Sequence, residues 1–227
     1  FEASGGLPDE DTKYAVYRRI LEWAQGRPVT IRTLDAGGDK PIKGLTIDGE
    51  SNPFLGLRGI RLSLARPEVF RVQLRALSRA AVHGMLKVML PMIAVPAELD
   101  RAAVMLDAEF AALRMEGIAC ARPPLGIMVE VPAAALRAED FDAAFYSIGS
   151  NDLTQYTMAA ARDIGAVADL NDAGHPAVLA LIARTVEAAR KRDVEVSLCG
   201  DAAADPRLTT ALLATRLASL PGAPVPV

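Results

Sequence analysis

Residues 125–132 read Leu-Gly-Ile-Met-Val-Glu-Val-Pro. The first five residues are apolar and too few for an ordinary helix, which is typical of a strand that is covered on both faces. The run closes with a carboxylate, and the proline that follows cannot continue a central strand. This stretch therefore predicts a buried parallel strand that presents Glu130 at its carboxyl end.

Similar runs lie on either side of it, and each also predicts a strand. They cover residues 29–34, 85–90, 144–148 and 194–198. Apolar residues at helical spacing fill intervals between them, after Asp11 and over residues 66–82, 96–116, 175–191 and 205–216. Short strands that alternate with helices indicate parallel βα units. We expect an α/β fold of the TIM-type (β/α)8 barrel class that is incomplete in this chain, because only five strands can be recognised.

Three further segments stand beside this alternation. The helix after Asp11 has its apolar residues at Tyr14, Tyr17, Ile20, Leu21 and Trp23. Residues 35–59 are polar and rich in glycine and proline, and a connection of that length in a domain is usually functional or disordered. Residues 221–227 alternate proline with small residues and predict neither helix nor central strand.

The composition excludes several classes of protein. Hydrophobic residues make up 51% and charged residues 23% of the chain, and the net charge of −3 shows no basic excess for nucleic acid. No apolar run is long enough to cross a bilayer, and the first ten residues do not resemble a signal peptide. The two cysteines match no metal-ligand spacing. We expect a cytoplasmic protein that binds neither membrane nor nucleic acid.

Polar side chains gather at the carboxyl ends of the predicted strands. In a (β/α) barrel this face carries the catalytic residues. The residues in question are Arg32, Asp35, Glu130, Asn151, Asp152, Cys199 and Asp201.

Glu130 and Asp152 follow consecutive predicted strands, so their carboxylates can converge. Two carboxylates with an amide nearby suit Mg²⁺, which takes its remaining ligands from water and substrate. An equally good interpretation of the pattern is structural. In that case Glu130 pairs with an arginine, and Asp152 caps the helix that follows.

Arginines and one cysteine complete the set of candidates. Arg32, Arg58 and Arg162 could bind one anion, because a guanidinium group binds phosphate or carboxylate through two hydrogen bonds. The alternative for each of them is an ordinary surface arginine. Cys199 ends a strand and could act as a general acid, although such a cysteine is more often a small buried apolar residue.

Six segments, taken in order, resemble the phosphoenolpyruvate-binding domain of enzyme I of the bacterial sugar phosphotransferase system. The resemblance runs from about Leu7 to about Leu220. Six motifs in the same order are much more specific than any one of them. They cover residues 31–40, 52–61, 89–93, 126–132, 147–156 and 199–201.

The resemblance implies a barrel of the phosphoenolpyruvate/pyruvate family over residues 1–227 and a role for each matching residue. Glu130 and Asp152 would hold Mg²⁺, and Cys199 would protonate the enolate carbon. The phosphoryl group of phosphoenolpyruvate would be bound by Arg32, Arg58, Asn151 and Arg162. The implied partners are a second copy of the chain, a phosphorylatable histidine on a separate N-terminal domain and, through it, a phosphocarrier protein.

Departures from the family pattern qualify these expectations. Asp201 stands where the family has Glu, Ser150 where it has Thr, and Ala161 where it commonly has Asp. We expect the first barrel strand, the closing strand and the histidine domain to be missing from this chain, so that it does not complete phosphotransfer by itself. Two alternatives share the same binding residues, namely the barrel of a pyruvate phosphate dikinase or phosphoenolpyruvate synthase and a regulatory module without turnover.

Overall fold

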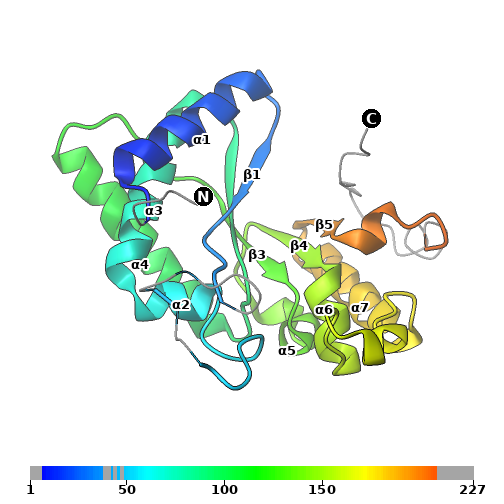
Figure 1. Ribbon diagram of the computed structural model, residues 1–227. Coiled ribbons are helices and arrows are strands. Elements are labelled where there is room, and N and C mark those ends of the chain that lie inside the picture. Colours follow the sequence, from blue (N-terminus) through cyan, green and yellow to red (C-terminus); the bar gives the residue numbers. More distant parts are fainter. Residues whose placement is uncertain (1–6, 38–41, 43–44, 47–48, 209–227) are drawn as a thin grey trace. The chain divides into compact units, whose positions relative to one another are not determined.

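The computed structural model describes residues 7–208 except for 38–41, 43–44 and 47–48 (Figure 1). Contacts divide the chain into two compact units, each of which is described by itself below. Unit 1 comprises Phe1–Leu90 and Asp100–Leu125, and unit 2 comprises Pro91–Leu99 and Gly126–Val227.

Unit 1 is built around a parallel pair of strands. Strands β1 (Val29–Arg32) and β2 (Leu86–Leu90) pair from Val29 opposite Leu86 to Arg32 opposite Met89. The N–H of Thr33 donates to the carbonyl oxygen of Met89 at 2.9 Å, which extends the pairing by one residue. The helices of the unit are α1 (Glu10–Ala24), α2 (Ile60–Ala65), α3 (Pro67–Ala80), the 3₁₀ turn η1 (Ala81–His83) and most of α4 (Pro96–Met115).

Helix α1 begins at a side-chain cap. The Asp9 carboxylate accepts the N–H of Thr12 at 2.8 Å, which satisfies one of the free N–H groups of the first turn. Tyr17 and Leu21 are buried, as the helical spacing predicts. Ile20 and Trp23 are exposed, so the predicted apolar face of this helix is narrower than the sequence pattern indicated.

An ion-pair network joins α1, α3 and the end of α4 within unit 1. The guanidinium of Arg75 contacts the carboxylates of Glu10 at 2.6 Å and Glu116 at 2.7 Å. Arg79 contacts the same Glu10 carboxylate at 2.6 Å. Both arginines of α3 contact the Glu10 carboxylate of α1, and Arg75 also contacts Glu116. Such a network orders side chains that an isolated surface pair would leave mobile.

We expect Arg75→Met to lower the free energy of unfolding by about 1 kcal/mol near neutral pH. Arg75 holds the pKa of Glu116 below its usual value of 4.5. A carboxyl group with a lowered pKa stabilises the fold above its unfolded pKa, and that contribution is lost as the pH falls through the folded pKa. The difference between wild type and variant should therefore shrink below about pH 4.5.

Urea unfolding of both proteins near pH 7 and near pH 3 measures this effect. Arg18→Met is the matched control, because the ion pair of Arg18 is with Glu22 one helical turn away and both side chains are exposed. It should change stability far less than Arg75→Met does, because an exposed ion pair contributes little. A difference between wild type and Arg75→Met that stays constant with pH would contradict the proposed role of Glu116.

Unit 2 carries three parallel strands. Strand β4 (Phe145–Gly149) pairs with β3 (Leu125–Val129) on one side and with β5 (Glu195–Cys199) on the other. Every residue of β3 and β4 is buried, as expected when helices cover both faces. The unit also has α5 (Pro132–Leu136), η2 (Ala138–Asp140), α6 (Ser150–Met158), η3 (Gly165–Leu170), α7 (Pro176–Arg192) and η4 (Asp201–Ala204).

The predicted fold class is confirmed, with differences in detail. All five predicted strands are present, and strands that are consecutive in the sequence are neighbours within each unit. A TIM-type barrel has eight strands, so the α/β barrel predicted for this chain is incomplete in the described residues. The short helices α2 and α5 were not predicted, and α6 entered only through the structural interpretation of Asp152 as a helix cap.

The end of the chain gives less information. The predicted helix over 205–216 begins in the structure with a turn over residues 206–208, and its remainder lies outside the described residues, as does the predicted tail over 221–227. Among the helices that the structure describes, none is both long enough and apolar enough to span a membrane.

Candidate functional site

In unit 2, four of the predicted site residues lie at the carboxyl ends of adjacent parallel strands. Glu130 follows β3 directly, Asn151 and Asp152 lie in the first turn of α6 after β4, and Cys199 is the last residue of β5. Gly149 at the end of β4 lies opposite Cys199 in the strand register. The structure therefore brings these side chains to one edge of the three strands.

The Glu130 carboxylate is buried and held by the backbone. Glu130 is only 1% exposed, and its Oε1 atom accepts a hydrogen bond from the N–H of Met92 at 2.6 Å. Met92 has a φ of 61°, a left-handed conformation that is costly for any residue other than glycine. The hydroxyl of Tyr156 lies 3.8 Å from the Met92 sulfur. The strained backbone at Met92 thus presents a donor to Glu130.

Gly149 makes room for the same carboxylate. A Cβ atom at position 149 would lie 2.9 Å from Oε2 of Glu130 and 3.0 Å from its Cβ atom. Both distances are shorter than packed carbon atoms tolerate. The sequence analysis did not single out Gly149, although a glycine at the last position of an otherwise apolar strand is a recognised sign of close approach.

Asp152 is the third residue of α6 and is 7% exposed. The N-cap of this helix is Gly149, so Asp152 is not the N-cap residue that the structural interpretation made it. An acid in the first turn is favoured by the helix dipole. Two buried carboxylates at neighbouring strand ends are costly unless donors or a cation offset their charge.

The described residues contain no cluster of three or more His, Cys, Asp or Glu side chains in a metal-binding arrangement. The sequence predicted two carboxylate ligands for a metal. Mg²⁺ commonly takes one or two carboxylate ligands from the protein. Glu130 and Asp152 therefore remain chemically suited to Mg²⁺.

Asn151 is locked to the segment that follows β5. Its Nδ2 donates to Oδ2 of Asp201 at 3.1 Å, and its Oδ1 accepts the N–H of Asp201 at 2.9 Å. The neighbouring Ser150 hydroxyl donates to the carbonyl oxygen of Cys199 at 2.9 Å. Ser150 and Asp201 are both departures from the family pattern, and both serve here to position Asn151 or its helix.

Cys199 is half-buried among polar groups. Its sulfur donates to the carbonyl oxygen of Ile148 at 3.4 Å and accepts the hydroxyl of Ser147 at 3.5 Å. Ser197 lies behind Ser147, with the two hydroxyl oxygens 3.3 Å apart. This environment is more polar than the one expected for a cysteine that only fills the core.

Arg162 lies beyond the end of α6 and is anchored through its backbone. Its N–H donates to Oε1 of Gln155 at 3.1 Å. The preceding turn contains Ala159 in a left-handed conformation. These features set the position of the Arg162 backbone relative to α6.

In unit 1, the structure brings Arg32 and Arg58 together on one carboxylate. Arg58 contacts Asp35 through Nη2 at 2.9 Å and through Nε at 3.3 Å, and both side chains are buried. Nη1 of Arg32 lies 3.3 Å from the same carboxylate, and this arginine is 35% exposed. Asp35 therefore orients both arginines, a role that the sequence analysis did not give it.

The glycines near Arg58 serve internal packing. A Cβ atom at Gly37, where φ is +106°, would lie 2.8 Å from the Cβ atom of Arg58. The space beside Gly56 is filled by the carboxylate of Glu50. On sequence grounds, Gly56 and Gly59 were expected to let the backbone around Arg58 approach a ligand; at Gly56 that space holds the Glu50 side chain instead. Residues 38–40 of the first motif lie outside the described residues.

Comparison with known proteins gives a consistent result. The family described as PEP-utilising enzyme, PEP-binding domain, matches residues 1–225. A phosphoenolpyruvate-protein phosphotransferase from Geobacillus stearothermophilus is 47% identical over 214 residues, which are 93% of this chain and 37% of that protein. One from Haloferax volcanii is 46% identical over 219 residues, 94% of this chain and 39% of that protein. The chain thus spans less than two fifths of these curated relatives.

Among solved structures, a citrate lyase from Burkholderia xenovorans LB400 matches with a TM-score of 0.44 and 20% sequence identity. The match covers 65% of this chain and 52% of the citrate lyase chain. At that level the fold assignment rests on the strands and helices themselves.

Proposed function

The chain belongs to the PEP-binding domain family of the PEP-utilising enzymes, and from this premise we propose that residues 1–227 form a phosphoenolpyruvate-binding barrel domain of the enzyme I type. In this proposal the chain binds phosphoenolpyruvate with Mg²⁺. It supports transfer of the phosphoryl group to a histidine of a separate N-terminal domain, and pyruvate is released. The observation that carries the proposal is the pair of buried carboxylates, Glu130 and Asp152, at neighbouring strand ends in unit 2.

Glu130 and Asp152 are the residues that would hold the metal. Their oxygen atoms are hard ligands, and the N–H of Met92 together with the space at Gly149 keeps the Glu130 carboxylate in place. When bound, Mg²⁺ would offset the negative charge of the phosphate and of the enolate oxygen. Residues that position a ligating carboxylate in this way commonly matter almost as much as the ligand itself.

Arg32, Arg58, Arg162 and Asn151 would bind the phosphoryl group. Phosphoryl transfer depends mainly on positioning and on stabilising charge around the phosphate oxygens. Asp35 orients the guanidinium of Arg58, and Asp201 orients the amide of Asn151. Asn151 also lies in the first turn of α6, where backbone N–H groups and the helix dipole favour an anion.

Cys199 would act as the acid. After the phosphoryl group has moved from the enol oxygen to the histidine nitrogen, the enolate carbon needs a proton to become the methyl group of pyruvate. The Cys199 thiol would donate this proton and later regain one from solvent. The Ser147 hydroxyl, which donates to the sulfur, suits the thiolate left behind.

The partners follow from the same proposal. The histidine domain and, through it, a phosphocarrier protein would receive the phosphoryl group, and two copies of the chain would form a dimer. These assignments rest on the resemblance to enzyme I, since the chain spans only 37% of the relative from Geobacillus stearothermophilus.

We expect phosphoenolpyruvate to bind the purified chain when Mg²⁺ is present and not after chelation, because the substrate phosphate and carboxylate would share the metal with Glu130 and Asp152. Isothermal titration calorimetry measures this. Asp152→Asn should behave like the chelated wild type. Asp142→Asn should behave like the wild type with Mg²⁺, because Asp142 is an exposed carboxylate paired with Arg192. Binding that is insensitive to chelation, or absent from a folded chain, would contradict the proposal.

A further inference from the structure

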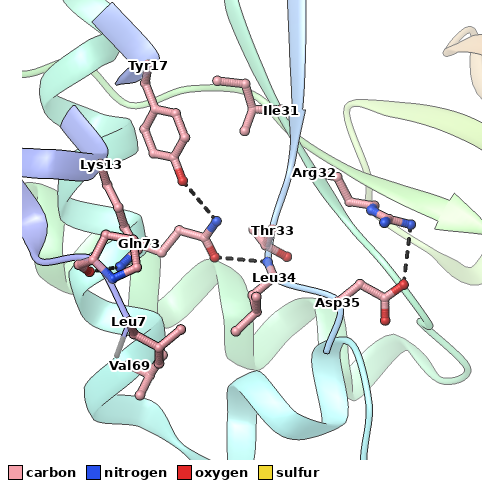
Figure 2. A pocket seen from close by; sticks show the side chains of 11 residues that line it. Leu7, Lys13, Tyr17, Ile31, Arg32, Thr33, Leu34, Asp35, Val69 and Gln73 are labelled. Atoms are coloured by element: carbon pink, nitrogen blue, oxygen red, sulfur yellow. Dashed lines mark hydrogen bonds and ion pairs between the residues drawn. The ribbon is translucent and has the colours of Figure 1, made fainter. Parts of the chain in front are cut away.

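Unit 1 contains a pocket whose lining shares only Arg32 and Asp35 with the proposed chemistry. It has a volume of about 220 Å³ and lies between α1, β1 and α3 (Figure 2). Its apolar lining comes from Leu7, Pro8, Ile31, Leu34 and Val69. A cavity of about 150 Å³ accommodates benzene, so by proportion this pocket has room for about nine non-hydrogen atoms.

A buried ammonium group lies at one side of the pocket. Lys13 is only 8% exposed, and its Nζ donates to the carbonyl oxygen of Pro8. Burial lowers the pKa of Lys13, and the nearby Asp9 carboxylate only partly opposes that effect. No ion pair of Lys13 with a carboxylate occurs among the described residues. The charged form of this side chain would therefore gain from an anion in the pocket.

Two hydroxyl groups add donors to the lining. The Oγ1 atom of Thr33, in a residue that is 2% exposed, has no hydrogen-bond partner in the described part of the chain. Oε1 of Gln73 accepts the N–H of Leu34 at 3.0 Å, which directs the Gln73 amide nitrogen toward the Tyr17 oxygen at 3.1 Å (Figure 2). Since the Tyr17 oxygen accepts that bond, its own proton is directed to another acceptor. Buried donors without a partner are costly, and a ligand that accepts hydrogen bonds removes the cost.

The other charged groups of the lining do not cancel this preference. Asp35 also lines the pocket, but its carboxylate is engaged by Arg58 and Arg32. Arg32 itself lines the pocket and adds a second positive charge. The groups that face the pocket thus carry a net positive charge of about one unit, with donors in excess of acceptors.

We propose that this pocket binds a small monocarboxylate with an apolar body, whose carboxylate accepts hydrogen bonds from Lys13, Thr33 and Tyr17. The apolar body packs against the aliphatic side chains of the lining. The pocket borders the proposed phosphoenolpyruvate chemistry at Arg32 and Asp35, but none of these three donors has a role in that chemistry.

Benzoate, which has about nine non-hydrogen atoms, is the probe, and benzamide is its neutral counterpart of equal size. Calorimetry with the full chain should show benzoate binding at least about tenfold more tightly than benzamide, as expected for charge-assisted hydrogen bonds in a buried site. Lys13→Met should weaken benzoate binding by a similar factor. Lys191→Met, which removes an exposed lysine paired with Glu187, should not change it.

Thr33→Val separates binding from folding. It removes a hydroxyl group without a partner, so it should raise or leave unchanged the urea midpoint of the free chain while it weakens benzoate binding. Equal affinity for benzoate and benzamide would overturn the proposal. So would benzoate binding that is unchanged in Lys13→Met, which would place the anion at Arg32, or the absence of benzoate binding by the folded wild type.

Discussion

Replacing Asp35 with asparagine is expected to lower the free energy of unfolding by about 3–5 kcal/mol. Asp35 is the carboxylate that both Arg58 and Arg32 contact in unit 1, and Arg58 is itself buried. Asparagine has the same size, so the packing is preserved and only the negative charge is lost. The buried Arg58 guanidinium then loses the negative charge that Asp35 supplies, and removing one member of a buried ion pair is costly.

Urea unfolding at neutral pH measures the loss. Asp107→Asn is the matched control, because Asp107 pairs with Arg122 while both side chains are exposed. Its cost should stay below about 1 kcal/mol. The double variant Asp35→Leu with Arg58→Met should recover much of the stability, since replacing both members of a buried pair by apolar groups is often neutral. A small loss in Asp35→Asn alone would mean that Arg58 reaches other acceptors or water.

The strands could be predicted from the sequence because each is a short apolar run with a clear end. Val131-Pro132 after β3 and the glycines near the ends of β4 and β5 mark those ends in the chain itself. Both faces of β3 and β4 are covered, so their residues are buried throughout, whereas burial alternates along β1 and β5. Helix α6 was recognised only through the interpretation of Asp152 as a helix cap, for a related reason. It begins at Ser150 directly after the strand, and its polar first turn has the composition of a loop.

The parts of the site that are set by contacts between distant residues could not be predicted. The backbone N–H of Met92 reaches the Glu130 carboxylate because Met92 has a left-handed φ. No local sequence preference indicates such a conformation at a methionine. Asp35 was recognised as a residue at a strand end, but its place between two arginines depends on how residues 35–58 fold back. The pairing of Asn151 with Asp201 likewise needs β4 and β5 to be neighbours.

Gly149→Ala is expected to weaken Mg²⁺-dependent phosphoenolpyruvate binding by about a hundredfold, if Glu130 holds the metal as proposed. The added methyl group would lie 2.9 Å from Oε2 and 3.0 Å from Cβ of Glu130, and 3.1 Å from Cγ of Met128. All three atoms belong to buried side chains, so the methyl group can be accommodated only if the Glu130 carboxylate moves. The hydrogen bond from Met92 resists that movement.

Overpacking of this kind costs about 1–3 kcal/mol of stability, so binding must be measured on a chain shown by circular dichroism to be folded. Gly165→Ala is the control, because a Cβ atom there meets nothing within 4 Å. It should leave both stability and binding close to wild type. Glu130→Gln should lose binding to at least the same degree as Gly149→Ala, since both variants remove the carboxylate from its position. Unchanged metal-dependent binding in a folded Gly149→Ala chain would show that Glu130 is not a metal ligand, and Asp152 would then be the only carboxylate left to the proposed magnesium site.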